Sequence, residues 1–186
     1  RIRRTMESCD AIMVSTRYLA AQAASLGRPV FIHRNGFSQE MLAISERAAA
    51  QSHAGRKRTV IGYASGTPTH NRDFATIGEP LRKVLDRHAD LTLWVIGPLK
   101  LDSAWQPYPR NRVLKLAYVP WTLLPGYLAG FDINLAPLIC DNPFARSKSE
   151  IKWMEAALVG VPTLASPADA FQEVINPDID GFLADT

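Results

Sequence analysis

The chain has 186 residues, of which 47% are hydrophobic and 21% charged, a balance that excludes a disordered protein and suits one globular domain, or one domain plus part of another. No apolar run approaches the ~20 residues of a membrane-spanning helix, and the basic residues 1–4 are not followed by the apolar core of a secretion signal. The formal net charge of +3 is spread along the chain, which suits a small anionic ligand better than nucleic acid.

The first part of the chain predicts a short alternation of helices and strands. Apolar and β-branched runs favour strands, and 3.6-residue periodicity favours helices. The expected elements are a helix in 1–10, a strand at 11–15, a helix at 16–25 and a strand at 29–32. An Asn-Gly turn follows at 35–36, and residues 40–58 lack a strong apolar face. We interpret that stretch as a linker that contains a helix.

From residue 59 onward, short apolar runs alternate regularly with helical patterns. Strands are expected at 59–63, 91–96, 113–116, 132–136, 161–165 and 181–184. Helices are expected at 72–88, 120–128, 149–159 and 168–175, with Pro80 kinking or splitting the first and Gly160 ending the third. Such alternation predicts an α/β fold, a Rossmann-like doubly wound parallel sheet with helices on both faces.

Three segments together resemble one enzyme class, and they cover nearly the whole chain. They are residues 9–16 with 27 and 34–37, residues 61–74, and residues 146–163. The chain resembles GT-B glycosyltransferases of the retaining family 4, or group 1, type, which includes sucrose and glycogen synthases and many bacterial cell-surface sugar transferases. The third segment is the most specific, because its loop, helix, helix stop and following strand all agree with that class.

The resemblance implies two parts. Residues 1–57 would be the end of an N-terminal Rossmann domain and the linker, and residues 58–186 a nucleotide-sugar-binding domain that is truncated at its C-terminus. Because the sequence does not begin with Met, we expect it to start partway along a longer protein. The acceptor site and the catalytic partners would lie in the missing part, so no catalytic residue is assigned here and the isolated chain is expected to be inactive.

One departure from the family pattern concerns the third segment. Its usual form has two glutamates separated by seven residues; Glu155 matches the second, but Ser147 occupies the first position. The subgroup that this chain resembles has a Ser-Lys-Ser segment there, which leaves the contacts to the sugar open.

Several residues are candidates for binding the donor. Lys148 precedes the helix at 149–159, where its ammonium and the helix N-terminus could face phosphate. Gly66, His70 and Arg72 follow the first strand of the second part, at the carboxyl edge where doubly wound sheets bind ligands. The resemblance implies that Glu155 accepts hydrogen bonds from the ribose hydroxyls.

Each candidate also has an ordinary structural interpretation. Glu155 could be a solvated carboxylate, and Lys148 could cap a turn. Lys152 could face the site or be a surface lysine. His70 could bond the loop backbone, and Arg72 could be only an N-terminal helix residue. Residues 121–124 match the segment with which the resembled class holds the base. Trp121 could equally belong to the core.

Other chemistries are poorly supported. The sequence has no catalytic triad, no phosphate-binding loop ending in Gly-Lys-Ser/Thr and no Gly-x-Gly-x-x-Gly loop. The histidines at 33, 53, 70 and 88 are scattered, and Cys9 and Cys140 form no Cys-x-x-Cys pair. Neither a metal site nor a disulfide framework is therefore predicted, and a cytoplasmic location is the default.

The resemblance implies that the parent protein is a hexosyltransferase, which transfers sugar from a nucleoside-diphosphate donor with retention and without metal or cofactor. The acceptor would be a cell-surface glycan, a lipid-linked molecule or a protein, as in polysaccharide biosynthesis, and the parent could associate peripherally with a membrane. Nucleic acid is not an expected partner. The alternatives are a non-catalytic nucleotide-sugar-binding or interaction module, which Ser147 favours, and a sugar-nucleotide epimerase, for which extra carboxylates and histidines are lacking.

Overall fold

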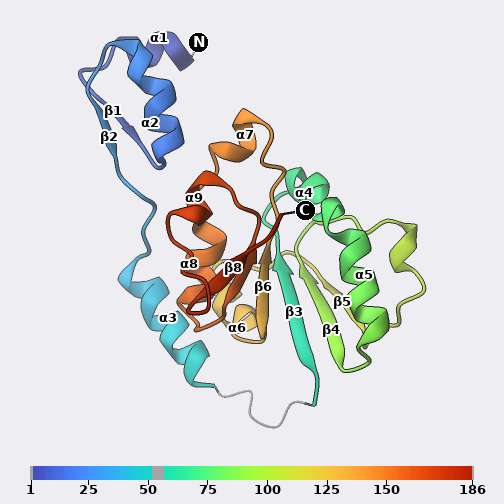
Figure 1. Cartoon of the computed structure of the whole chain (residues 1–186). Helices are drawn as coiled ribbons and strands as arrows, with labels where there is room; N and C mark the ends of the chain where they lie inside the picture. Colours follow the sequence, from blue (N-terminus) through green and yellow to red (C-terminus); the bar gives the residue numbers. More distant parts are fainter. Residues whose placement is uncertain (1, 52–56, 186) are drawn as a thin grey trace.

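The computed structural model describes residues 2–51 and 57–185 and is built around one parallel sheet (Figure 1). The six strands lie in the order β5-β4-β3-β6-β7-β8, and every neighbouring pair is parallel. They are β3 (Thr59–Ala64), β4 (Leu91–Ile96), β5 (Val113–Leu116), β6 (Ile133–Ala136), β7 (Thr163–Ala165) and β8 (Gly181–Leu183). The chain thus winds outward in both directions from β3, which confirms the predicted doubly wound α/β fold.

Helices cover both faces of this sheet. One face packs against α4 (Asn71–Thr76) and α5 (Gly78–Arg87), and the other against α3 (Gln39–Ala50), α6 (Leu124–Leu128) and α8 (Ile151–Ala157) (Figure 1). Strand β4 shows why both faces must be covered. Its Leu93 and Val95 belong to the core under α4 and α5, whereas Ile96 belongs to the core on the opposite side. Successive side chains alternate between the faces of a strand, so an apolar run is buried on both.

Several boundaries differ from those expected. The predicted helix at 72–88 is two helices that meet at Ile77, and Pro80 lies in the first turn of α5, where a missing N–H is tolerated. Helix α6 begins at Leu124 rather than 120, and α8 begins at Ile151 rather than 149. The short helices α7 (Pro143–Arg146) and α9 (Asp169–Gln172) complete this part, and α7 was not predicted.

The segment expected to be a linker contains most of α3, and α3 packs against the rest of the protein through small residues. Ala48 is 8% exposed and joins the core that contains Leu128 of α6. Because alanine contributes little to an apolar pattern, the sequence showed no strong face here. The rest of the expected linker includes residues 52–56, which lie outside the described residues.

The N-terminal unit, residues 2–36, is separate from the large sheet. It contains α1 (Ile2–Glu7), β1 (Ile12–Val14), α2 (Arg17–Ala23) and β2 (Val30–Ile32), and β1 pairs with β2 in parallel (Figure 1). Thr16 caps α2 by accepting from the Leu19 N–H, and Gly27 has the positive φ that ends the following turn. In the described part of the chain, no helix is both long and apolar enough to cross a bilayer.

Gly62 in the middle of β3 is required by close packing. A Cβ built there would lie 2.1 Å from the ring of Phe131, which is 3% exposed. We expect Gly62→Val to lower the free energy of unfolding by about 2 kcal/mol, because the ring must leave its packed position. Urea denaturation measures this. Gly126→Ala is the matched control, since a Cβ at Gly126 meets nothing within 4 Å. Equal stabilities of the two variants would contradict the packing argument.

Candidate functional site

A cavity of about 710 Å³ lies beside the carboxyl ends of β3 and β6. These strands are neighbours at the centre of the sheet, and the chain leaves them in opposite directions, so their following loops separate and open a crevice. The lining comes from the loop after β3, the end of β4 and the residues after β5, together with α7, α8 and the turn between them. Ser15, directly after β1, adds a contribution from the N-terminal unit.

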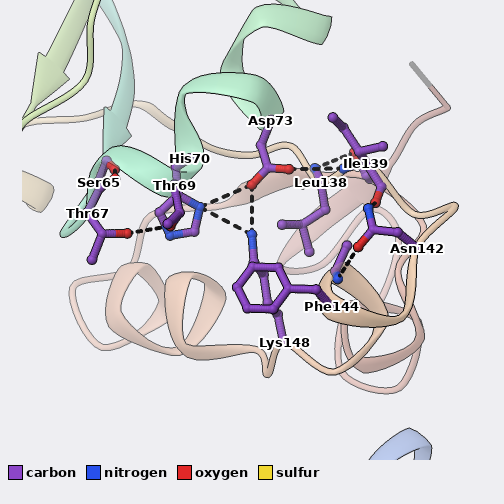
Figure 2. Close-up of polar contacts among 12 residues, drawn as sticks. Ser65, Thr67, Thr69, His70, Asp73, Leu138, Ile139, Asn142, Phe144 and Lys148 are labelled. Atoms are coloured by element: carbon purple, nitrogen blue, oxygen red, sulfur yellow. Dashed lines mark hydrogen bonds and ion pairs between the residues drawn. The ribbon is translucent and has the colours of Figure 1, made fainter.

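Asp73 in the first turn of α4 joins three segments at this crevice (Figure 2). Its Oδ2 accepts from Lys148 Nζ at 2.7 Å and is 3.2 Å from His70 Nδ1. Its Oδ1 accepts from the backbone N–H of Ile139 at 3.2 Å. One carboxylate therefore ties the loop after β3, the loop after β6 and the residues before α8 to each other.

Asp73 remains ionised although it is only 5% exposed. Burial alone would raise its pKa, but the hydrogen bonds from His70, Lys148 and the Ile139 N–H outweigh burial and lower the pKa to about 2. At neutral pH a fixed negative charge thus holds the ammonium group of Lys148 at the cavity wall.

Lys152, in the first turn of α8, is a second cation at the cavity. Its Nζ donates to the carbonyl of Ala64 and lies 4.6 Å from the centre of the Tyr63 ring. Burial, reinforced by the nearby Lys148, lowers the pKa of Lys152 to about 8, while Glu155 and Asp73 oppose that shift. Its charge is therefore sensitive to pH just above neutrality.

Glu155 lies about one turn after Lys152 on α8, and it also lines the cavity. Its carboxylate has no hydrogen-bond partner among the described residues. Burial raises the pKa of Glu155, and the charge of Lys152 opposes that rise. An acceptor group with unused capacity is thus presented to the same cavity as two ammonium groups, a set that can bind a ligand carrying both hydroxyls and negative charge.

The structure brings most of the predicted donor-binding residues together. Gly66, His70, Lys148, Lys152 and Glu155 all line the cavity. Arg72 does not, because it lies on the exposed side of α4, whereas its buried neighbour Asp73 contacts Lys148 of the cavity lining. The alternative that Trp121 belongs to the core is wrong, since its side chain is 47% exposed and lines the cavity.

Two residues that sequence reasoning missed are Asp73 and Tyr63. A signal for Asp73 was available, because it follows His70 by three residues and so lies within reach on one helical turn. Nothing in the sequence indicated Tyr63, which reads as an ordinary core residue of a buried strand. Its hydroxyl is buried and has no partner among the described residues, and burial raises its pKa, as does the nearby Asp73.

Ser147 occupies the position of the first family glutamate, and it too lines the cavity. Its hydroxyl donates to the carbonyl of Phe144 at 2.7 Å, which closes the turn after α7. Across residues 2–51 and 57–185, no group of three or more His, Cys, Asp or Glu side chains is arranged to hold a metal ion.

Several solved structures share the fold at low sequence identity. Anabaena HepE, in complex with UDP and glucose, has 16% identity and a TM-score of 0.63 over 95% of this chain and 49% of its own. The pneumococcal O-GlcNAc transferase GtfA, in complex with UDP and GlcNAc, has 16% identity and a TM-score of 0.71 over 99% of this chain and 35% of its own. A trehalose-6-phosphate synthase, studied for glycosyl transfer with retention, has 13% identity and a TM-score of 0.66 over 92% of this chain and 49% of its own.

The chain therefore spans about half, or less, of the length of these structures. No curated protein matches it in sequence. A family model described as "Glycosyl transferases group 1" matches residues 58–186, a range that contains the whole parallel sheet and every cavity residue except Ser15. With this match over more than half of its length, the chain belongs to the group 1 family of glycosyl transferases.

Proposed function

We propose that the protein containing this chain transfers a sugar from a nucleoside-diphosphate sugar, and that this chain supplies the donor-binding half. One observation carries the proposal: Glu155, Lys148 and Lys152 border the same cavity at the centre of the sheet. A nucleoside diphosphate combines ribose hydroxyls with negative charge, and this set of groups complements both. Family membership supports the same conclusion.

In this proposal each group has a distinct task. The carboxylate of Glu155 accepts from the ribose hydroxyls, and the ammonium groups of Lys148 and Lys152 face the diphosphate. As the bond to the sugar breaks, negative charge develops on the leaving diphosphate, and cations already in place stabilise it without reorganising. The exposed rings of Tyr118 and Trp121, on the cavity rim, would lie near the base.

We propose further that the donor is a UDP-hexose, that transfer proceeds with retention, and that cationic side chains replace a metal ion. HepE and GtfA were solved with UDP, and the trehalose-6-phosphate synthase was studied for retention. The acceptor is proposed to be a cell-surface glycan, a lipid-linked molecule or a protein. The parent would act in the cytoplasm, with peripheral attachment to a membrane where the acceptor is lipid-linked.

A second candidate is a binding module that keeps the fold without the chemistry. Ser147 favours it, because a short hydroxyl that donates to the carbonyl of Phe144 replaces a carboxylate of the family pattern. Transfer activity in the full-length protein would exclude this candidate.

Titration of the chain with UDP, GDP, ADP and CMP by calorimetry tests the proposal. We expect one diphosphate to bind selectively and Lys148→Ala to weaken it. Lys83→Ala is the matched control, because Lys83 pairs with Glu79 on exposed α5. If neither the chain nor the full-length protein binds any of the four nucleotides, the proposed function is wrong.

Donor binding should depend on pH through Lys152. With a pKa of about 8, Lys152 is charged below that pH and loses its charge above it. We expect the affinity for UDP to fall roughly tenfold between pH 7 and pH 9, in step with the charged fraction. Lys152→Met should bind more weakly at pH 7 and show no such fall; a fall of equal size in the variant would assign it to another group.

A further inference from the structure

Residues just after β2 contact the turn that carries Lys148. Arg34 Nη1 donates to Glu150 Oε1 at 3.1 Å, and Asn35 Nδ2 donates to Ser149 Oγ at 2.6 Å. Both acceptors directly follow Lys148 in the sequence. The connection joins segments more than 110 residues apart, and it links the end of the N-terminal unit to the donor cavity.

Glu150 depends on this contact because it is buried. The residue is 4% exposed, and its second carboxylate oxygen has no partner among the described residues. Arg34 is the one described cation that pairs with it. A buried carboxylate that loses its cation is strongly unfavourable, so removal of Arg34 favours arrangements of the turn in which Glu150 reaches water.

The turn at 147–150 is thus held from two sides. On one side Lys148 binds Asp73 of α4, and on the other side Ser149 and Glu150 bind the residues after β2. Arg34 also pairs with Glu173, the residue after α9, which in turn pairs with Arg17 of α2 at 3.2 Å. The N-terminal unit therefore docks through polar contacts next to the residues that would bind phosphate.

We propose that Arg34 is a positioning residue for the donor site: by pairing with Glu150 it fixes the turn that presents Lys148, and it couples docking of the N-terminal unit to nucleotide binding. The inference rests on the proposed function, since it assigns the cavity to a nucleoside diphosphate. Coupling of this kind is reciprocal. If the docked unit favours nucleotide binding, then bound nucleotide must favour the docked unit.

Three variants separate this role from a general effect on folding. Arg34→Met keeps the length of the side chain and removes the charge. Arg34→Lys restores one cation but not the fork that reaches Glu150 and Glu173 together. Arg3→Met is the matched control, because it removes an exposed arginine of the same unit whose printed ion-pair partner is Glu7 of α1, away from the docking contacts.

The experiment titrates each variant with UDP and follows hydrogen exchange of the amides in β1 and β2. We expect Arg34→Met to weaken UDP binding about fivefold or more, Arg34→Lys to recover part of the affinity, and Arg3→Met to bind as the unchanged chain does. UDP should slow exchange in β1 and β2 of the unchanged chain but not of Arg34→Met. Unchanged affinity in Arg34→Met, or equal slowing in both, overturns the proposal.

A different result identifies failure of the proposed function itself. If the unchanged chain binds no UDP, the pairing is tested without ligand through the urea midpoints of Arg34→Met, Glu150→Gln and the double variant. If the effects of the two substitutions on stability are not additive, Arg34 and Glu150 interact, and Arg34 still fixes the turn. Only the assignment of the cavity to a nucleotide would then be wrong. Additive effects would overturn the positioning role as well.

Discussion

Glu155→Gln is expected to weaken binding of the preferred nucleotide roughly 10- to 100-fold, the value of hydrogen bonds to a charged acceptor. The side chain keeps its size and its place on α8, but an amide offers a single neutral oxygen where the carboxylate offered two charged ones. The variant should lose hydrogen bonds to the ribose but not to phosphate. Its affinity for inorganic pyrophosphate, which has no ribose, should therefore change little. Calorimetric titration of both ligands measures the difference.

Glu79→Gln is the control for this prediction. Glu79 lies on α5, is exposed and pairs with Lys83 at 2.7 Å, far from the cavity lining. Glu79→Gln removes the same charge from the chain as Glu155→Gln does, so a general electrostatic effect would appear in both variants. If Glu155→Gln binds UDP as tightly as Glu79→Gln does, Glu155 is not the ribose acceptor.

Asp73→Asn is expected to lower the free energy of unfolding by about 2 kcal/mol at pH 7, since a pKa of about 2 replaces an ordinary value of 3.8. A carboxyl whose pKa is lowered on folding contributes stability above its unfolded pKa and loses it as pH falls through its folded pKa. The difference between the variant and the unchanged chain should therefore shrink as pH falls from about 3.8 to about 2. Urea denaturation across that range measures it.

Asp169→Asn is the matched control. Asp169 pairs with Arg146 at 2.9 Å, but its side chain is 34% exposed, and exposed ion pairs contribute about 0–1 kcal/mol. The contrast between the two variants isolates the effect of burial. A loss in Asp73→Asn that stays constant down to pH 2 would show that its cause is packing and not charge.

The chemical groups of the site could largely be predicted, but their pairing could not. The positions of Glu155, Lys148 and Lys152 at the cavity could be anticipated, because each lies at a fixed distance from a helix boundary or a family motif. Asp73 was missed because its partner Lys148 is 75 residues away. Such a contact depends on two loops leaving neighbouring strands, which no local pattern reveals.

Arg72 illustrates a second limit. Arg72 and Asp73 are consecutive residues of α4, and neighbours on a helix point about 100° apart. Helix α4 has only six residues, too few for an apolar pattern to fix which side faces the sheet. From the sequence, either Arg72 or Asp73 could have faced the site. In the structure Phe74 packs against Tyr63, and this orientation of the helix turns Asp73 inward.

The sequence by itself determined the alternation of strands with most of the helices, the doubly wound class and the edge of the sheet at which the cavity lies. These follow from local periodicity and from the geometry of parallel strands, which act over a few residues. Only the tertiary structure decided that Asp73 holds Lys148, that Arg34 reaches Glu150, and that Glu155, near Lys152, has no hydrogen-bond partner among the described residues. Those features are set by burial and long-range contact, because the pairing of a charge depends on which side chains remain near it once water has been excluded.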